Sequence, residues 1–482
     1  MAYAESIKDG DALIEALETA RKARKPVIFM KVGRSAVGAA AASSHTASLA
    51  GEDAIYDAVL KQYGAHRART TEEMLDIAYA CRPRLYPTGR KLGLVTISGG
   101  AGVLMADAAE DHGLDVAAMP EDAQADLKAL VPFAAPRNPV DVTAQFFNDL
   151  SLVPKFTATM LDRGGYDGLI GFWTSVAGSP LLSEPLRAYL QEAMTGRANT
   201  PFLHCLLASP EIQRTYDEDG FPNFEDPSRA VAAMAALMGF GEAFARPAAA
   251  PPPLPDLAPL PEGPISEKAA KEVLAAAGLP MVMDRLATNA GEAADAAGAI
   301  GGPLAMKIAS ADIAHKSDIG GVRLGVAPAD AAMVYEEIVA AAARNAPEAA
   351  IDGVLISPMV GEGVDCILGA KVDPVFGPVV MVGLGGVFTE ILGDVAFRRA
   401  PIGDAEALEM LRSLKGAALL DGARGQTPVD KMALARAVSA LSGFATVHAD
   451  TLASVEMNPI RANAEGVLAL DALIVTCAET EA

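Results

Sequence analysis

The chain has 482 residues, of which 51% are hydrophobic, and a formal net charge of −22 at pH 7. This length suggests about three domains of roughly 150 residues each, and the acidic field excludes binding to nucleic acid or anionic membrane through overall charge. The four cysteines match neither a zinc spacing nor a disulfide framework, and no apolar span of about 18 residues occurs, so we expect a cytoplasmic protein without nucleic-acid or membrane partners.

The first 245 residues alternate helical and strand-like stretches. Helical stretches such as "DALIEALETARKAR" alternate with the short apolar runs "PVIFMKVG", "KLGLVTISGG" and "YDGLIGFWTS". This alternation is typical of parallel sheets covered by helices. We therefore expect two α/β domains, residues 1–90 and 91–245.

His45 lies in "SSHTASLAG", after the strand-like "PVIFMKVGR". The small neighbours offer no bulky side chain that would pack the imidazole into a core, and they favour a loop before a helix starting near Glu52. Imidazole is nucleophilic near neutral pH, and small neighbours would let a phosphoryl donor approach it. A lone loop histidine is also commonly a solvated surface residue, so both interpretations stay open on this motif alone.

A glycine-rich turn follows the next predicted strand in "VTISGGAGVLMADAAEDHG". The order strand, turn, helix would expose backbone N–H groups at a helix N-terminus, where they could hold a phosphate. The residues concerned are Ser98, Gly99, Gly100, Ala101 and Gly102. Such turns are also common where a helix simply packs closely on a strand.

Proline marks the clearest boundary in the chain. Residues 246–264 read "RPAAAPPPLPDLAPLPEGP", in which eight of nineteen residues are proline, and this composition favours an extended linker. After it, "ISEKAAKEVLAAAGLP" predicts a helix with Ser266 as its N-cap. Apolar strands, glycine-rich turns and further helices then predict a third, mixed α/β region over residues 265–482.

Two stretches of this third region carry candidate phosphate and metal chemistry. In "AMKIASADIAHKSDIGGVRLG", Lys307 ends an apolar strand, and His315 precedes a loop whose paired glycines, Gly320 and Gly321, suit close approach to phosphate oxygens. The ordinary alternatives are a solvated strand end, a surface histidine and a hairpin turn.

The second stretch, "VEMNPIRANAEGVLALDALIV", offers the oxygen ligands Glu456, Asn458 and Asp471 near strand ends. These side chains form a plausible Mg²⁺ set. Carboxylates at strand ends are more often only solvated, so spacing alone leaves this interpretation open.

Several long segments resemble one family. "GRSAVGAAAASSHTASLAGED" resembles the phosphohistidine loop of the ADP-forming (NDP-forming) acyl-CoA synthetases, the acetate–CoA ligase relatives of succinyl-CoA synthetase. "ASADIAHKSDIGGV", "DPVFGPVVMVGLGGVFTEILGDVAFRRAPI" and "EMNPI" are similar to the histidine, nucleotide and metal segments of its ATP-grasp part. The resemblance runs over nearly the whole chain. It implies an α/β fold with two flavodoxin-like (succinyl-CoA synthetase-like) parallel-sheet domains, followed by an ATP-grasp domain with two subdomains.

The resemblance also implies a mechanism. A small carboxylic acid, coenzyme A and ATP would give acyl-CoA, ADP and phosphate, reversibly, through an acyl phosphate. His315 would take the γ-phosphoryl group of Mg-ATP and pass it to His45, which would phosphorylate the acid. "YAESIKDG" is similar to the family segment whose glutamate bonds the phosphohistidine, which assigns that role to Glu5. The turn at residues 98–102 would hold the phosphate carried by His45.

Other residues of the nucleotide site follow from the same resemblance. Lys307 would contact the nucleotide phosphates, and Asn458 and Asp471 would bind Mg²⁺. The strand "GVLISPMV", with Ile356, Ser357 and Met359, would offer backbone groups to adenine. Asp365 stands where the family usually has glutamate, and Gly320 and Gly321 belong to the loop that follows His315.

The sequence departs from the family at its start. Full-length relatives begin with a CoA-binding domain and the first strands of the histidine-bearing domain, so we expect a longer chain, or a partner acting in trans, to supply them. A homo-oligomer is the expected assembly. An alternative function stays open: a non-ligase ATP-binding, phospho-carrier or regulatory module that phosphorylates its histidines without forming a thioester.

Overall fold

The computed structural model describes residues 1–35, 52–247, 251–310, 312–313, 316–385, 393–425 and 427–480. Both predicted phosphorylation sites, His45 and His315, lie outside these residues. The chain divides into two compact units, the first formed by Met1–Ala50 and Leu60–Ala248, the second by Gly51–Val59 and Ala249–Ala482. Within the described residues, every helix is too short or too polar to span a bilayer.

The first unit contains a three-stranded parallel sheet in the order β1-β2-β3. Its elements are β1 (Ala2–Ala4), α1 (Gly10–Lys22), β2 (Val27–Lys31), β3 (Ala65–Arg67) and α4 (Thr71–Ala80). Most of helix α3 (Asp53–Gln62), which precedes β3 in the chain, belongs to the second unit. Helix α1 begins where the carboxylate of Asp9 accepts the N–H of Ala12 at 2.9 Å, and it turns Ile14 and Leu17 inward. The central strand β2 is apolar over most of its length because neighbours flank it on both sides.

A second parallel sheet of the same unit has the order β5-β4-β6-β7-β8. Its strands are β4 (Leu92–Thr96), β5 (Val140–Asp141), β6 (Gly168–Thr174), β7 (Phe202–Leu206) and β8 (Asn223–Phe224). Its helices are α5 (Gly99–Asp111), α6 (Glu121–Leu130), α7 (Leu152–Arg163), α8 (Ser183–Met194) and α9 (Pro210–Glu218). Numbered along the chain, this is the flavodoxin-like order 2-1-3-4-5, whose switch point lies between β4 and β6.

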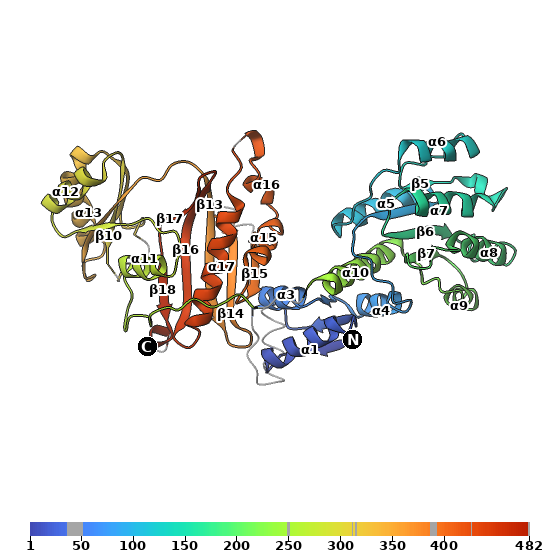
Figure 1. Cartoon of the computed structure of the whole chain (residues 1–482), viewed down its shortest axis with the longest axis horizontal. Helices are drawn as coiled ribbons and strands as arrows, with labels where there is room; N and C mark the ends of the chain where they lie inside the picture. Colours follow the sequence, from blue (N-terminus) through green and yellow to red (C-terminus); the bar gives the residue numbers. More distant parts are fainter. Residues whose placement is uncertain are drawn as a thin grey trace. The chain divides into compact units, whose positions relative to one another are not determined.

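Helix α10 (Pro227–Ala245) joins the two sheets of the first unit. It contacts α4 and β3 from the first sheet and α5, β6, β7 and β8 from the second (Figure 1). It begins at Pro227, where the side chain of Asp226 accepts the N–H of Ser228 at 2.7 Å. Because α10 is packed on several sides, most of its residues are apolar and eleven of them are buried.

The second unit contains two antiparallel sheets. The smaller has the order β11-β10-β12-β9 and is covered by α12 and α13. Its elements are β9 (Arg285–Ala287), α12 (Ala290–Ile300), β10 (Leu304–Ala309), β11 (Val322–Val326), α13 (Ala331–Asn345) and β12 (Gly353–Pro358). Helix α11 (Glu267–Ala276) precedes it, and the predicted cap is confirmed because Oγ of Ser266 accepts the N–H of Ala269.

The larger sheet has the order β15-β14-β13-β16-β17, with β18 paired to β16. Its elements are β13 (Val364–Asp373), β14 (Gly377–Leu384), β15 (Val395–Arg399), α15 (Asp404–Arg412), α16 (Ala417–Leu420), α17 (Lys431–Val447), β16 (Leu452–Asn463), β17 (Gly466–Ala469), β18 (Leu473–Thr476) and α18 (Cys477–Thr480). Helix α17 lies along one face of this sheet and packs on β13 and β14 (Figure 1). The long strands β13 and β16 form the centre of the unit's main core.

Candidate active site

The glycine-rich turn lies at the switch point of the second sheet. Strand β4 ends at Thr96, and Oγ1 of Thr96 both accepts the N–H of Ser98 and donates to its carbonyl oxygen, each at 2.9 Å. This pair of bonds fixes the turn that leads into α5. Ser98 occupies the N-cap position in an extended conformation, but its side chain makes no capping bond, and the first turn of α5 holds no acidic residue.

The N–H groups at the start of α5 therefore have no side-chain acceptor from the helix itself. A Cβ placed on Gly100 would meet no heavy atom within 4 Å, so the helix end is open at this position. Uncapped N–H groups and the positive end of the helix dipole suit an anion. Gly102 has a different role, because its Cβ would lie 3.0 Å from Cβ of Pro139 and 3.3 Å from Cγ2 of Thr96.

The segment "RNPVDVTA", residues 137–144, runs alongside β4 and leads from its first residues to the start of α5. The buried amide of Asn138 accepts the N–H of Leu94 at 2.9 Å and donates to the carbonyl of Leu92 at 3.0 Å. The side chain of Asn138 thus forms hydrogen bonds with the backbone of β4, as the backbone of a neighbouring strand would. Oδ2 of Asp141 lies 3.2 Å from the position of a Cβ on Gly99, which places a carboxylate close to the start of α5.

Two threonines at this edge have an unfavourable backbone conformation. Thr143, just after β5, has φ 67°, and Thr174, the last residue of β6, has φ 52°. Positive φ is uncommon for a β-branched residue and tends to occur at functional sites. No sequence signal pointed to either residue.

Glu5 follows β1 directly and is partly buried. Because β1 and β2 are parallel, Glu5 lies at the sheet edge where the chain leaves β2 toward the segment that contains His45. Within the described residues the Glu5 carboxylate has no hydrogen-bond or ion-pair partner. The predicted contact of Glu5 with His45 stays a prediction, because His45 lies outside the described residues.

In the second unit, Lys307 belongs to a largely buried group of charged side chains that we call the charged cluster. The cluster consists of Glu267, Lys271, Asp284, Lys307, Lys316 and Asp471. Nζ of Lys307 donates to the carbonyl of Leu470 at 3.1 Å and lies 3.3 Å from Oδ2 of Asp471. The cluster holds three ammonium and three carboxylate groups, and this balance lets the charges be buried together.

Ionisation of the charged cluster follows from these contacts. Burial opposes the charge on Glu267, but Lys307, Lys271 and Lys316 outweigh it and lower the pKa of that carboxyl below its usual range. Burial alone would lower the pKa of Lys307, whereas Asp471 and Glu267 raise it. Burial raises the pKa of Asp471, and Lys307 opposes this effect.

Asn458 and Asp471 come together although thirteen positions separate them. The N–H of Leu470 donates to the carbonyl of Pro459 at 2.9 Å, so the two residues flank one backbone hydrogen bond. Their side chains offer an amide oxygen and a carboxylate, and the amide Nδ2 of Asn458 donates to Oε1 of Glu456 at 3.1 Å. In the described residues no group of three or more His, Cys, Asp or Glu side chains could hold a metal. Two oxygen ligands do suit Mg²⁺, which usually keeps waters and takes its other ligands from phosphates.

The remaining predicted nucleotide residues lie on β12 or directly after it, on β13 and in the turn before β11. Ile356 pairs with Met306 on one side and Arg285 on the other. The buried Ser357 pairs with β10, and the N–H of Met359 donates to the carbonyl of Pro303 at 2.9 Å. Much of the backbone of these three residues is already hydrogen-bonded to neighbouring strands or to Pro303. Their contacts with adenine stay predictions.

Asp365 and the paired glycines have clear structural contacts. Oδ1 of Asp365 accepts from Nε of Arg461 at 2.5 Å, so its carboxylate forms an ion pair across β13 and β16. Gly320 has φ 72°, and the N–H of Gly321 donates to the carbonyl of Lys316 at 2.8 Å. These glycines therefore close a tight turn, and their contact with nucleotide phosphates stays a prediction.

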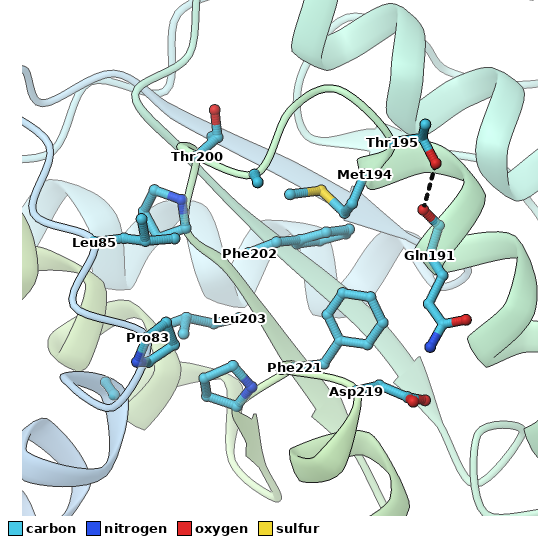
Figure 2. A pocket seen from close by; sticks show the side chains of 15 residues that line it. Pro83, Leu85, Gln191, Met194, Thr195, Thr200, Phe202, Leu203, Asp219 and Phe221 are labelled. Atoms are coloured by element: carbon cyan, nitrogen blue, oxygen red, sulfur yellow. Dashed lines mark hydrogen bonds between the residues drawn. The ribbon is translucent and has the colours of Figure 1, made fainter.

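A cavity of about 370 Å³ in the first unit lies away from these residues. Figure 2 shows Leu85, Met194, Phe202 and Phe221 among its lining side chains. Phe202 is the first residue of β7, so the cavity opens at the amino ends of the strands. Ligands of such sheets bind at the carboxyl ends, and we do not assign this cavity to the reaction.

Three family models match successive parts of the chain. A succinyl-CoA ligase-like flavodoxin domain matches residues 1–81, a ligase-CoA domain residues 92–218, and an ATP-grasp domain residues 262–476. These matches confirm the expected fold class, with flavodoxin-like parallel-sheet domains followed by an ATP-grasp domain. Together, the three matches point to an enzyme of the acid–thiol ligase class.

Individual relatives narrow this class. An ADP-forming acetate–CoA ligase I of Archaeoglobus fulgidus is 32% identical over 97% of this chain and 68% of its own length. An ADP-forming 4-hydroxybutyrate–CoA ligase of Nitrosopumilus maritimus is 33% identical over 95% of this chain and 67% of its own. A solved acetyl-coenzyme A synthetase 1 of Ca. Korarchaeum cryptofilum, in complex with coenzyme A and Ca-AMPCP, is 38% identical, covers 44% of this chain and 93% of its own, and has a TM-score of 0.43. The chain belongs to the family of ADP-forming acyl-CoA ligases.

Proposed function

We propose that the chain forms acyl-CoA from a small carboxylic acid, coenzyme A and ATP, releasing ADP and phosphate, through a relay from His315 to His45. Two observations support this proposal, the uncapped N-terminus of α5 in the first unit and the charged cluster beside Asn458 and Asp471 in the second. The charged cluster with Asn458 and Asp471 supports a nucleotide site, and the open start of α5 supports a site for a transferred phosphate. The reaction class follows from the family.

In the second unit, Lys307 would contact the nucleotide phosphates, and Asn458 and Asp471 would hold Mg²⁺. The metal would neutralise charge on the phosphates during transfer. A ring nitrogen of His315 would attack the γ-phosphorus while the bond to the β-phosphate oxygen breaks, which releases ADP and leaves phosphohistidine. Lys307 would have to exchange part of its contact with Asp471 for phosphate oxygens.

In the first unit, the phosphoryl group would pass to His45 and then to the acid. Glu5 would form a hydrogen bond with the imidazole of His45 and stabilise the charged form of that ring. The N–H groups of residues 98–102 would hold the phosphate oxygens. The acid's carboxylate would displace His45 from phosphorus, and the thiolate of coenzyme A would attack the acyl carbon and expel phosphate.

We assign no part of the described residues to the binding of coenzyme A. We propose that a CoA-binding domain, on a longer chain or a partner, completes the enzyme, and that the enzyme is a homo-oligomer. A reducing compartment such as the cytoplasm fits the four cysteines, all of which are free thiols. The negative charge disfavours nucleic-acid or membrane partners.

The test is thioester formation by the chain supplied with a family CoA-binding domain. We expect ADP release that requires both an acid and coenzyme A, and its loss by at least about a thousandfold in His45→Ala and His315→Ala because each histidine carries the phosphoryl group. His112→Ala, a change at the end of α5, is the control. Labelling of both histidines by γ-labelled ATP without any thioester would favour a phospho-carrier module instead. Full activity in either variant would refute the relay.

A further inference from the structure

We infer that Glu267 is a positioning residue that holds Lys316, and with it the turn of residues 316–321, against β10 beside Lys307. The consequence for phosphoryl transfer rests on the proposed function, whereas the positional claim does not. Neither the sequence nor the family resemblance had pointed to Glu267.

Glu267 stands at the point where three lysines converge. It is the first residue of α11, which begins there because Ser266 caps the helix. Its side chain is 6% exposed, and its Oε1 lies 2.9 Å from Nζ of Lys271 and 3.5 Å from Nζ of Lys307, in ion-pair contact without hydrogen-bond geometry. Its Oε2 accepts from Nζ of Lys316.

The three lysines do not depend on Glu267 equally. Lys271 also contacts Asp284 at 2.5 Å, and Lys307 also contacts Asp471 at 3.3 Å. In the described part of the chain, Glu267 is the carboxylate with which Lys316 pairs. Loss of the Glu267 charge would therefore release Lys316 first and leave Lys307 with a partner.

The turn after Lys316 transmits this contact to the strand. The N–H of Gly321 donates to the carbonyl of Lys316 at 2.8 Å, and the N–H of Ile308 donates to the carbonyl of Gly321 at 2.7 Å. A Cβ on Gly321 would lie 2.7 Å from Cγ2 of Ile308, so the turn packs directly on β10. One carboxylate thus fixes two ammonium groups, those of Lys307 and Lys316, relative to the same strand. Two ammonium groups in fixed relation suit the oxygens of a polyphosphate.

The first experiment measures position alone. Amide hydrogen exchange is followed in the whole chain for Glu267→Gln and for Glu272→Gln, a matched control on the same helix whose carboxylate is 55% exposed and pairs with Lys268. We expect exchange at Gly320 and Gly321 to become about tenfold faster in Glu267→Gln and to stay unchanged in Glu272→Gln. Lys316→Met should reproduce the effect from the other side of the contact. Unchanged protection in both Glu267→Gln and Lys316→Met would overturn the inference.

The second experiment measures the chemical consequence. The rate of His315 labelling by γ-labelled ATP and the Kd for Mg-ADP are compared in the same variants. We expect Glu267→Gln and Lys316→Met each to slow labelling about tenfold, and the double variant to be no slower than either single variant. The Kd for Mg-ADP should change less than about threefold, because Asp471 still holds Lys307 in place. Glu267→Asp, which keeps the charge, should recover part of the rate. Wild-type labelling in Glu267→Gln, or additive losses in the double variant, would overturn the mechanistic part. Failure of wild-type protein to label at all would refute the proposed function, and the exchange experiment would still decide the positional claim.

Discussion

His204 illustrates how burial alone sets the chemistry of a residue. It lies on β7 with no solvent exposure, and its ring packs against Phe202 and Phe221. Nε1 of Trp173 donates to its Nδ1 at 2.9 Å, while its Nε2 is buried without a partner in the described part of the chain. Burial lowers the pKa of His204 from 6.5 to about 3. The folded protein therefore keeps this ring neutral near neutral pH.

This shift predicts a loss of stability in acid. The unfolded chain binds a proton at His204 below pH 6.5, whereas the folded chain does so only near pH 3. Stability contributed by the neutral ring is complete above pH 6.5 and falls as the pH drops toward 3, by up to about 1.4 kcal/mol per pH unit. The fluorescence of Trp173, the single tryptophan, reports unfolding of the first unit in urea. Between pH 6.5 and 5, the free energy of unfolding of the wild-type protein should fall more steeply than that of His204→Asn, by up to about 1.4 kcal/mol per pH unit. Parallel pH profiles for the two proteins would contradict the assignment.

Single residues were predictable from sequence where one local rule decides them. Ser266 was identified as an N-cap because a hydroxyl before an apolar helical run is sufficient. Lys307 and Asp471 were each identified by resemblance, and the structure places their charged groups 3.3 Å apart. Glu267 was missed because an acidic residue in the first turn of a helix is ordinary, and its importance comes from lysines 40 and 49 positions away. Thr143 and Thr174 gave no signal because backbone strain depends on the packing around it.

At the scale of elements, the sequence could not distinguish two of the three glycines of α5. Gly100 faces open space, whereas Gly102 packs against Pro139 and Thr96. Alanine favours a helix over glycine by up to about 1 kcal/mol, and a methyl group forced into a tight contact costs about 1–3 kcal/mol. We therefore expect Gly100→Ala to keep or raise the free energy of unfolding and Gly102→Ala to lower it by about 1–3 kcal/mol.

The measurement for this pair is urea unfolding followed by Trp173 fluorescence. Phosphorylation of His45 by labelled ATP provides a second readout. Gly100→Ala should slow this labelling although it does not destabilise the fold, because its methyl group stands at the proposed phosphate site. Equal stability of the two variants would show that the contacts of Gly102 relax at no cost.

The order of the strands was only partly predictable. Alternating helices and apolar runs predicted parallel sheets, because a parallel sheet needs a crossover for each strand. The same pattern does not reveal that β5 is only two residues long, or that Asn138 bonds to β4 through its side-chain amide. The antiparallel sheets of the second unit likewise could not be ordered from sequence, since their pairings join strands as distant as β13 and β16.

At the scale of the whole molecule, the proline-rich segment has more structure than its composition implied. Residues 251–266 carry no helix or strand, as an extended linker should. Leu257 and Leu260, however, pack against the core of the second unit, and Cδ of Pro255 lies 3.2 Å from the position of a Cβ on Gly443 in α17. Part of the segment is therefore packed against the core of the second unit and is not a free linker. The expected domain limits of 1–90, 91–245 and 265–482 stay predictions.

This docking predicts which leucines protect the segment. Leu257 and Leu260 are partly buried, whereas Leu254 is 50% exposed and serves as the matched control. Truncating two partly buried leucines to alanine removes about 1–3 kcal/mol of apolar contact in total. The docked segment should then open more often, because it has no hydrogen-bonded element of its own to hold it in place. In limited digestion with a broad-specificity protease, Leu257→Ala/Leu260→Ala should be cut within residues 251–266 about tenfold faster than the wild type. Leu254→Ala should be cut at the wild-type rate, and equal acceleration in both variants would mean that the segment is a free linker throughout.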